Sequence, residues 1–273
     1  MKSSSLRTDR AGLLACGVSS SFAQQFWSAL RGWWREQADE KGVAATVRLT
    51  LGNLWTFARD STPARRRQRY GDMEYDWEHR VNTTSGTVDW RARLLGLFRS
   101  PYQPTDPALF CEMMASLSVL SQQFPEQFEF ETFTFIDLGS GKGRTLLMAS
   151  EYPFRKIVGV ELIAELHRAA EENILAYRSA TQRCANIEAV CADACAFLFP
   201  AEPLVLYLFN PLPEFGLRRL IAGLEKSLAA NPRSVYLLYH NPLLERVLGE
   251  SAVFARVGGT EQYSIYSCAG KSV

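Results

Sequence analysis

The chain has 273 residues, of which 47% are hydrophobic and 22% charged, and its formal net charge at pH 7 is +1. This length allows one large core or two modest ones, and the composition excludes a disordered chain and a disulfide-stapled miniprotein. The six cysteines lack the paired spacing of a zinc site, no apolar run approaches a membrane span, and the N-terminal run AGLLA is too short for a signal peptide. We therefore expect reduced cysteines, no bound metal and a cytoplasmic protein.

The first hundred residues are basic and carry two helical patterns. They hold 16 Lys and Arg against 10 Asp and Glu, whereas residues 101–273 hold 14 against 19. Apolar residues at helical spacing predict two amphipathic helices that pack on their own domain, with contact of their aromatic faces to a membrane or a partner as the alternative. These residues are Phe22, Phe26, Trp27, Leu30, Trp33 and Trp34 in the first helix and Val43, Val47, Leu51, Leu54, Trp55 and Ala58 in the second. The arginine run over residues 59–69 is interpreted as a solvated linker, with binding to phosphates or to an anionic membrane as open alternatives.

Beyond about residue 108, short apolar runs alternate with helical patterns. Strands are predicted at residues 133–138, 156–161, 187–191, 204–209 and 234–239, and helices at 142–151, 163–177 and 213–230, with a short one after Asp193. Such alternation is typical of a parallel sheet with helices on both faces. Strand-like pieces at 252–257 and 262–268, joined by Gly258-Gly259, predict an antiparallel hairpin at the sheet edge. The predicted fold class is α/β: a doubly wound, mostly parallel sheet of about seven strands with an N-terminal helical extension.

Polar residues gather at one edge of this predicted sheet. In open parallel sheets, ligands bind outside the carboxyl ends of the strands, where the winding direction reverses. The residues at those ends are Asp137, Gly139, Glu161, Asp193, Asn210 and His240. We therefore expect the ligand site at this edge.

The segment FIDLGSGKGR, residues 135–144, is the most specific motif. A phosphate-binding P-loop requires Ser or Thr after Gly-Lys, but Gly143 follows Lys142. The dinucleotide fingerprint requires glycine where Arg144 stands, and arginine is too bulky for the close helix packing that a third glycine allows. What remains is an acidic residue followed by three alternate glycines. Such a loop lets the backbone approach a cofactor closely, and Asp137 places negative charge near a cation.

This loop resembles the first motif of the class I, seven-strand, Rossmann-like S-adenosylmethionine-dependent methyltransferases. The resemblance implies S-adenosyl-L-methionine as cofactor. It also implies a cofactor-binding role for the loop residues Asp137, Gly139, Ser140, Gly141, Gly143 and Arg144.

Two further acidic residues extend the resemblance. Glu161, 24 residues after Asp137, would accept both ribose hydroxyls in a bidentate hydrogen bond, with helix capping as the alternative. Asp193 matches an acidic residue that takes the adenine amino group in these families. A capping role for Asp193 in the short helix that follows is compatible with adenine binding.

The fourth predicted strand ends in Asn210-Pro211, where this enzyme class places residues that face the transferred methyl group. In its amino-methylating members, an Asn or Asp followed by prolines and an aromatic residue orients the substrate nitrogen. Here Leu212 and Pro213 depart from that pattern, and a plain turn at Asn210 is the alternative. His240, the one imidazole in the predicted crevice, is a second candidate catalytic residue, with a turn histidine as the alternative.

Tyr102 and Thr105 stand in YQPTDPALF, just before a predicted helix that leads into the glycine loop. This arrangement is similar to the non-SET, seven-strand lysine methyltransferases, in which a Tyr-x-x-Thr element closes over the methionine end of the cofactor. The element Tyr75-Asp76 resembles one found in uncharacterised bacterial class I methyltransferases. The surrounding YDWEH segment is a candidate lid over the cofactor.

These observations predict an N-terminal helical extension with a lid or linker over residues 1–100 and an S-adenosylmethionine-binding methyltransferase domain over residues 101–273. We expect N-methylation of an amine such as a protein lysine. The alternatives are a methyltransferase acting on a small molecule or on RNA or DNA, an NAD-dependent oxidoreductase, and a non-catalytic nucleoside-binding protein. The expected partner is a protein or small-molecule acceptor, nucleic acid is not favoured, and the sequence does not fix the oligomeric state.

Overall fold

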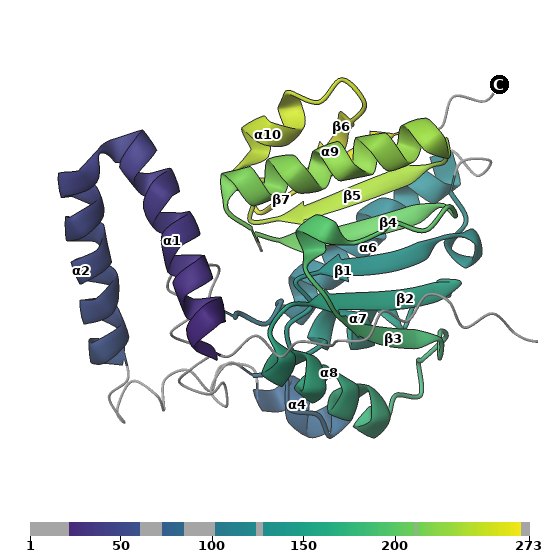
Figure 1. Ribbon diagram of the computed structural model, residues 1–273. Helices are drawn as coiled ribbons and strands as arrows, with labels where there is room; N and C mark the ends of the chain where they lie inside the picture. The colour runs from purple at the N-terminus through teal and green to yellow at the C-terminus, as the bar shows by residue number, and fades with distance from the viewer. Residues whose placement is uncertain (1–21, 61–72, 85–101, 124–127, 211, 269–273) are drawn as a thin grey trace, which may run out of the picture.

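The computed structural model describes residues 22–60, 73–84, 102–123, 128–210 and 212–268. Its centre is a seven-stranded sheet in the order β3-β2-β1-β4-β5-β7-β6 (Figure 1). Strands β1 to β5 are parallel, and β7 is antiparallel to both β5 and β6. The strands are β1 (Thr134–Leu138), β2 (Lys156–Glu161), β3 (Ile187–Cys191), β4 (Leu204–Phe209), β5 (Val235–His240), β6 (Ala255–Gly259) and β7 (Tyr263–Cys268).

The predicted fold class is confirmed: the sheet has seven strands, is mostly parallel, and carries an antiparallel edge. Strands β2, β3 and β4 have the predicted bounds. The prediction that Gly258-Gly259 joins the hairpin is wrong, because β6 runs through Gly259 and residues 260–262 form the turn. A Cβ atom at Gly259, where φ is +121°, would lie 2.3 Å from the carbonyl oxygen of Tyr263, so glycine serves close strand approach there.

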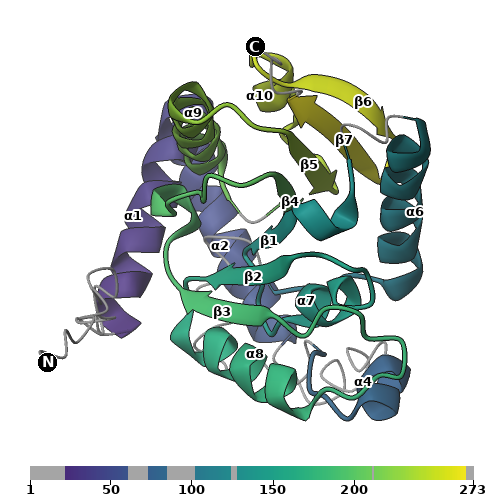
Figure 2. The ribbon, with the colours of Figure 1, turned by 90° about the vertical axis from the view of Figure 1, so that its right-hand side faces the viewer.

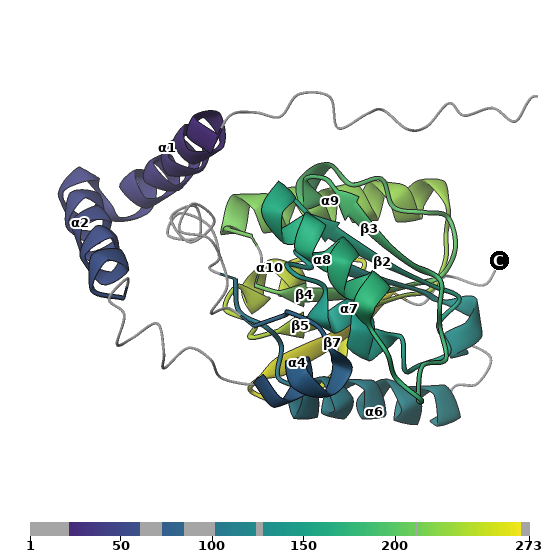
Figure 3. The same cartoon turned by 90° about the horizontal axis from the view of Figure 1, so that it is seen from below.

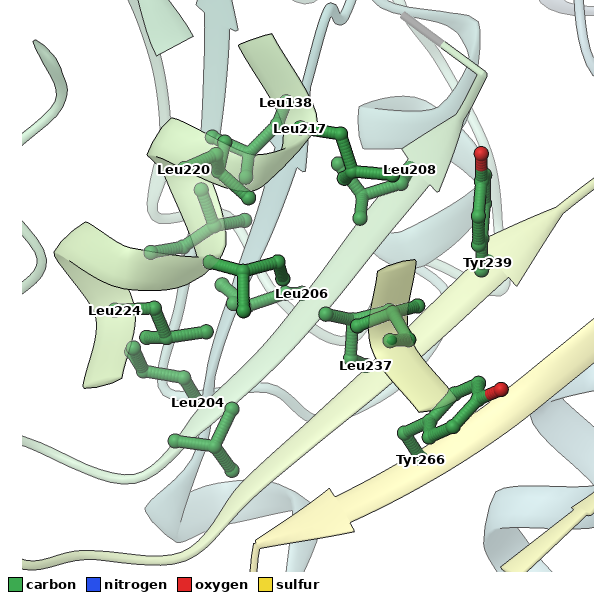
Figure 4. Packing of buried hydrophobic residues seen from close by; sticks show 14 of the residues in the cluster. Leu138, Leu204, Leu206, Leu208, Leu217, Leu220, Leu224, Leu237, Tyr239 and Tyr266 are labelled. Atoms are coloured by element: carbon green, nitrogen blue, oxygen red, sulfur yellow. The ribbon is translucent and has the colours of Figure 1, made fainter. Parts of the chain in front are cut away.

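Side-chain alternation along the strands divides the core between the two faces of the sheet. Helix α9 (Glu214–Ala230) covers one face, and α6 (Pro107–Gln123) and α7 (Arg144–Ala149) cover the other. Figure 2 shows α9 and α6 on opposite sides of the sheet. Each fully buried leucine side chain in these layers contributes about 1.5–3 kcal/mol. The face under α9 is rich in leucine (Figure 4), with Leu138, Leu204, Leu206, Leu208, Leu217, Leu220, Leu224 and Leu237 in contact.

The remaining elements border the sheet. Helix α8 (Ala164–Ala176) packs beside β2 and β3, and α10 (Glu245–Gly249) beside α9. Short 3-10 turns lie at η2 (Phe130–Thr132) and η3 (Ala194–Ala196), the latter at the position predicted for a short helix after Asp193. Helix α4 (Met73–His79) lies below α8 in Figure 1.

The two predicted N-terminal helices are confirmed as α1 (Phe22–Lys41) and α2 (Val43–Asp60), joined at Gly42, where φ is 83°. They form a helical hairpin in which α1 lies nearer the sheet and α2 lies on the outer side (Figures 1 and 3). The expectation that both apolar stripes pack on their own domain is wrong for α2. Five residues of its predicted stripe are exposed, namely Val43, Val47, Leu51, Leu54 and Trp55, whereas the buried position is Thr46. The side chain of Ala58, the sixth residue of that stripe, lies outside the described part of the structure. Within the described residues, no helix combines the length and apolar character needed to cross a membrane.

Candidate functional site

The glycine loop joins β1 to α7 through three residues in the left-handed backbone region. The angle φ is 96° at Gly139, 56° at Gly141 and 83° at Gly143. The N–H groups of Gly139 and Ser140 donate to the carbonyl of Val160 at 2.8 and 3.1 Å, which fastens the loop to β2. Because glycine adopts positive φ without a Cβ clash, the spacing of the glycines sets the shape of the loop.

The ring of Tyr102 lies against this loop. A Cβ atom at Gly141 would fall 2.1 Å from Cε2 of the ring. The Tyr102 hydroxyl donates to the carbonyl of Thr83 at 2.5 Å, so the ring is held at both ends. The absence of a side chain at Gly141 therefore leaves room for the ring of Tyr102. From the sequence, we expected a cofactor to occupy this space.

Three acidic side chains lie at or near the carboxyl ends of three adjacent strands and line one cavity. Asp137 lies near the end of β1, Glu161 ends β2, and Asp193 follows β3. Since β1, β2 and β3 are parallel neighbours in the sheet, their carboxyl ends meet at the same edge. The site that the sequence predicted at this edge is thus a cavity with three acidic side chains where it meets the sheet.

Glu161 is buried, and each of its oxygens accepts a backbone hydrogen bond. Oε2 accepts from the N–H of Gly141 at 2.9 Å, and Oε1 accepts from the N–H of Ile163 at 2.7 Å. Ile163 is the residue before α8, so the capping alternative describes one of these two bonds. Each carboxylate oxygen can accept more than one hydrogen bond, so these contacts are compatible with the predicted ribose role.

Asp193 is exposed at the start of η3. Its Oδ1 accepts from the N–H of Cys195 at 2.9 Å, which is the capping role considered from the sequence. The adenine role of Asp193 stays a prediction.

Asp137 is fully enclosed, and burial raises its pKa to about 8. A hydrogen bond from Thr145 lowers the pKa, and the negative charge of Glu161 raises it, both by less than burial does. The carboxyl group is therefore largely protonated at neutral pH. A cation bound beside Asp137 would favour its ionised form.

Ser140 carries a buried hydroxyl oxygen that has no hydrogen-bond partner among the described residues, and the residue lines the cavity. A buried hydroxyl without a partner lowers stability by about 1–3 kcal/mol, so such groups in native proteins usually meet a ligand or water. The orphaned hydroxyl marks this part of the cavity as a place for a polar ligand.

The cavity has a volume of about 1130 Å³. Pockets for one small ligand span about 300–1,000 Å³, so this cavity can hold a cofactor together with an acceptor group. Gly141, Gly143 and His240 do not line it. The predicted site residues that do line it are Tyr102, Thr105, Asp137, Gly139, Ser140, Arg144, Glu161, Asp193 and Asn210.

Asn210 lies on the cavity wall at the end of β4. Its φ of 45° is left-handed, as the turn alternative implied. Its Oδ1 accepts a hydrogen bond from the hydroxyl of Tyr239 at 3.2 Å, which fixes the orientation of the amide. Pro211, the second residue of the predicted Asn-Pro element, lies outside the described residues.

His240 ends β5, buried beside the cavity instead of in its wall. Its ring stacks on Phe209 with a centroid distance of 3.8 Å, and Nδ1 lies 2.7 Å from the hydroxyl of Tyr207. That hydroxyl is also 2.8 Å from Oγ1 of Thr105. Burial lowers the pKa of His240 to about 4, so the imidazole is neutral at pH 7. The structure thus places His240 to position Tyr207, and its catalytic role stays a prediction.

Arg144 is buried and reaches away from the loop toward residues 75–84, which we call the strap. Its Nη2 pairs with Oδ1 of Asp76 at 3.2 Å, and its Nε donates to Oγ1 of Thr83 at 2.6 Å. Its guanidinium carbon lies 4.9 Å from the centroid of the Tyr75 ring. Arg144 therefore ties the Tyr75-Asp76 element to the glycine loop, while its predicted contact with the cofactor stays a prediction.

The sequence reasoning missed a second connection between the strap and the loop. The ammonium of Lys142 is buried and donates to the carbonyl of Thr84 at 3.0 Å, and burial lowers its pKa to about 8. Asn173 of α8 donates to the carbonyls of Lys142 and Asn82 at 2.9 and 3.1 Å. Lys142 had been considered only as a P-loop lysine, and no local pattern relates Asn173 to the loop.

Helix α1 forms the outer wall of the cavity, a placement that no sequence signal indicated. Trp33, Arg35, Glu36, Asp39 and Glu40 of α1 line it. Oε1 of Glu36 accepts from the N–H of Glu214, the first residue of α9, at 3.2 Å. Three of the α1 side chains in this wall are carboxylates and one is an arginine, while Arg218 and Arg219 of α9 and Arg246 of α10 also line the cavity.

Comparisons with known proteins find likenesses of fold. No protein-family model matches the chain, and no curated protein sequence matches it. An RNA methyltransferase from Salinibacter ruber in complex with S-adenosyl-L-homocysteine is 20% identical, with a TM-score of 0.40, over 63% of this chain and 96% of that chain. A ribosomal protein L11 methylase from Lactobacillus delbrueckii subsp. bulgaricus is 17% identical, with a TM-score of 0.37, over 57% of this chain and 77% of that chain.

Proposed function

We propose that the chain is an S-adenosylmethionine-dependent methyltransferase whose acceptor is an amine. The observation that carries the proposal is the single cavity in which Asp137, Glu161 and Asp193, from the carboxyl ends of three adjacent parallel strands, lie beside the unpartnered hydroxyl of Ser140. The cofactor supplies a methyl group on a cationic sulfonium together with a cationic amino group. A buried acid at the loop suits both cations.

Each wall residue has a definite part in this proposal. Glu161 would hold the ribose and Asp193 the adenine amino group. Asp137 and the loop would hold the amino-acid end, and the Ser140 hydroxyl would gain the partner that it lacks. Tyr102, lying over the loop, would exclude water from that end of the site.

The structure also supports this cofactor over NAD. Arg144 occupies the position of the third fingerprint glycine, and its side chain is fixed by Asp76 and Thr83. A pyrophosphate at the loop would lie near the carboxylate of Glu161, which disfavours a dianion.

Two features favour an amine as the acceptor. The amide of Asn210, oriented by Tyr239, faces the cavity, and its oxygen can accept a hydrogen bond from an amine nitrogen. The α1 wall of the cavity carries the carboxylates of Glu36, Asp39 and Glu40 against one arginine, so an ammonium would meet more negative than positive charge on this helix. The amine would lose its proton to solvent, and Asn210 would orient its nitrogen lone pair toward the methyl group that the cofactor would supply. The new N–C bond would replace the C–S bond, whose electron pair would stay on sulfur.

Calorimetric titration of the full chain with S-adenosylhomocysteine and with NAD tests the cofactor. We expect binding of S-adenosylhomocysteine and none of NAD, and the reverse result would contradict the proposal. Incubation with methyl-labelled S-adenosylmethionine and a fractionated lysate then tests the acceptor. Label in methylated lysine supports the amine, whereas label in RNA or on oxygen or carbon would leave methyl transfer standing and overturn the acceptor.

A further inference from the structure

Helix α2 presents an apolar face to solvent. The residues of this face, which we call the outer stripe, recur every three or four positions and therefore share one side of the helix. Their exposed fractions are 64% for Val43, 42% for Val47, 62% for Leu51, 42% for Leu54 and 70% for Trp55. Isolated exposed apolar residues are ordinary on protein surfaces, but a contiguous stripe marks an interaction site.

The side of α2 that adjoins the outer stripe at Val43 is polar, buried or half-buried, and already hydrogen-bonded. Thr46 is fully buried, and its hydroxyl donates to the carbonyl of Gly42 at 2.9 Å. The hydroxyl of the half-buried Thr50 donates to the carbonyl of Thr46 at 2.7 Å. Since α2 packs on α1, its small polar side chains lie inward and its large apolar ones outward. This polarity is the reverse of what a hairpin surrounded by water requires.

The charge of α2 and of the sequence that follows it indicates what covers the outer stripe. The exposed Arg48 borders the stripe on the helical wheel beside Trp55. In the sequence, residues 43–69 hold six arginines and one aspartate, a net charge of +5, with no lysine or glutamate. Helices with valine, leucine and tryptophan on one face and arginine at its border bind anionic lipid surfaces, where the apolar face enters the headgroup boundary and the cations meet lipid phosphates.

We propose that the outer stripe of α2 docks the protein in the plane of an anionic membrane surface. Nucleic acid would satisfy the arginines but would leave Val43, Val47 and Leu51 exposed to water, because aliphatic side chains do not stack on bases as aromatic ones do. A lipid interface satisfies both the apolar stripe and the positive charge. The proposal is independent of methyl transfer, since its readout is binding.

Sedimentation of the full chain with vesicles tests this proposal. We expect binding to vesicles of phosphatidylcholine with phosphatidylglycerol, weaker binding at high salt, and little binding to phosphatidylcholine alone. The double variant Leu51→Glu with Leu54→Glu should lose at least about tenfold in affinity for the vesicles. It removes two leucines that the lipid would bury and adds two negative charges that the anionic surface repels, and both changes weaken binding. Its matched control, Leu175→Glu with Leu198→Glu, changes side chains that are 77% and 89% exposed elsewhere, and should bind as the unchanged protein does.

A second variant, Arg48→Glu, keeps the stripe and reverses one charge, so it tests the proposal even if the double variant fails to fold. It should weaken binding to the anionic vesicles. Equal binding by the stripe and control variants, or equal binding to neutral and anionic vesicles, would overturn the proposal. Two further results would overturn it if no variant changed binding to the vesicles. One is a dimer in solution that the stripe variant abolishes, and the other is retention on single-stranded RNA that the stripe variant abolishes.

Discussion

The ring of Tyr102 fills the space that a side chain at Gly141 would need, with Cε2 2.1 Å from the position of a Cβ atom. Gly141→Ala therefore forces the ring away, and it also strains a backbone with φ of 56°. We expect binding of S-adenosylhomocysteine, measured by calorimetry, to weaken at least about tenfold, a change of about 1.4 kcal/mol. Gly223→Ala is the control, since nothing lies within 4 Å of a Cβ atom there. Unchanged affinity in the Gly141 variant would contradict the placement of this loop in the site.

Glu161 is the second test of the cofactor site. Glu161→Ala removes the acceptor for the N–H groups of Gly141 and Ile163 together with the predicted ribose contacts. We expect the affinity for S-adenosylhomocysteine to fall by about 2–3 kcal/mol, because charge-assisted bonds are lost and polar groups are left unpaired. Glu188→Ala, on the exposed side of β3, should bind normally. A folded Glu161 variant with full affinity would restrict this residue to its capping bonds.

Asp137 predicts a pH dependence of stability in the ligand-free protein. Its pKa is about 8 when folded, and an unfolded aspartate has a pKa of about 3.9. The folded state therefore holds this proton more tightly, and the group contributes stability at low pH that is lost as the pH rises through about 8. The free energy of unfolding, measured with urea, should decline as the pH rises between these two pKa values. In Asp137→Asn this decline should be smaller. A variant with the same pH profile as the parent would contradict the raised pKa.

The same group predicts proton release on binding. A cationic ligand beside Asp137 favours the carboxylate, so S-adenosylhomocysteine should bind more tightly as the pH rises toward about 8. Calorimetry at pH 7 in buffers of different ionisation enthalpy would count the released protons. Asp137→Asn should release fewer protons than the parent, and equal release would assign the proton to another group.

Asn210 separates the acceptor from the cofactor. Because Tyr239 fixes its amide on the cavity wall, Asn210→Ala should lower turnover while leaving the affinity for S-adenosylhomocysteine nearly intact. The rate should also rise with pH as the amine acceptor loses its proton. Asn231→Ala, on the exposed end of α9, is the control for both measurements. Normal turnover of the Asn210 variant would remove this residue from the reaction.

The strap provides a test of stability. The pair Arg144–Asp76 is buried, with side-chain exposures of 1% and 11%, so removal of either charge deprives the other of this buried ionic partner. Arg144→Met or Asp76→Asn should each lower the free energy of unfolding by about 3–5 kcal/mol, and the double variant by less than the sum. The exposed pair Lys156–Glu188 should change it by only about 0–1 kcal/mol in the same urea experiment. Additive effects at the buried pair would show that the two charges do not interact.

The sheet was predictable because its signals are local. Strands β2, β3 and β4 are short, largely apolar runs with a polar residue at or just after their ends, and the periods of strand and helix differ enough to separate them. The glycine loop was predictable for a similar reason, since positive φ at Gly139, Gly141 and Gly143 is a property of the residue type. Carboxyl ends of parallel strands meet at one edge in any such fold, so the convergence of Asp137, Glu161 and Asp193 followed from their order in the sequence.

What only the tertiary structure decided is which partner each side chain has. In the sequence, Arg144 only argues against a dinucleotide-binding loop. In the structure, it forms an ion pair with Asp76 of the strap, which begins 69 residues earlier in the chain. The sequence suggests that the imidazole of His240 lies in the crevice, but the ring stacks on Phe209, and Phe209 lines the cavity whereas His240 does not. The apolar spacing in α2 predicts that its stripe is buried, but the side of the helix that packs on α1 carries threonines. The sequence by itself determined the elements and the loop, because backbone preference and apolar period act over a few residues, whereas contacts between distant segments depend on how the packed elements meet.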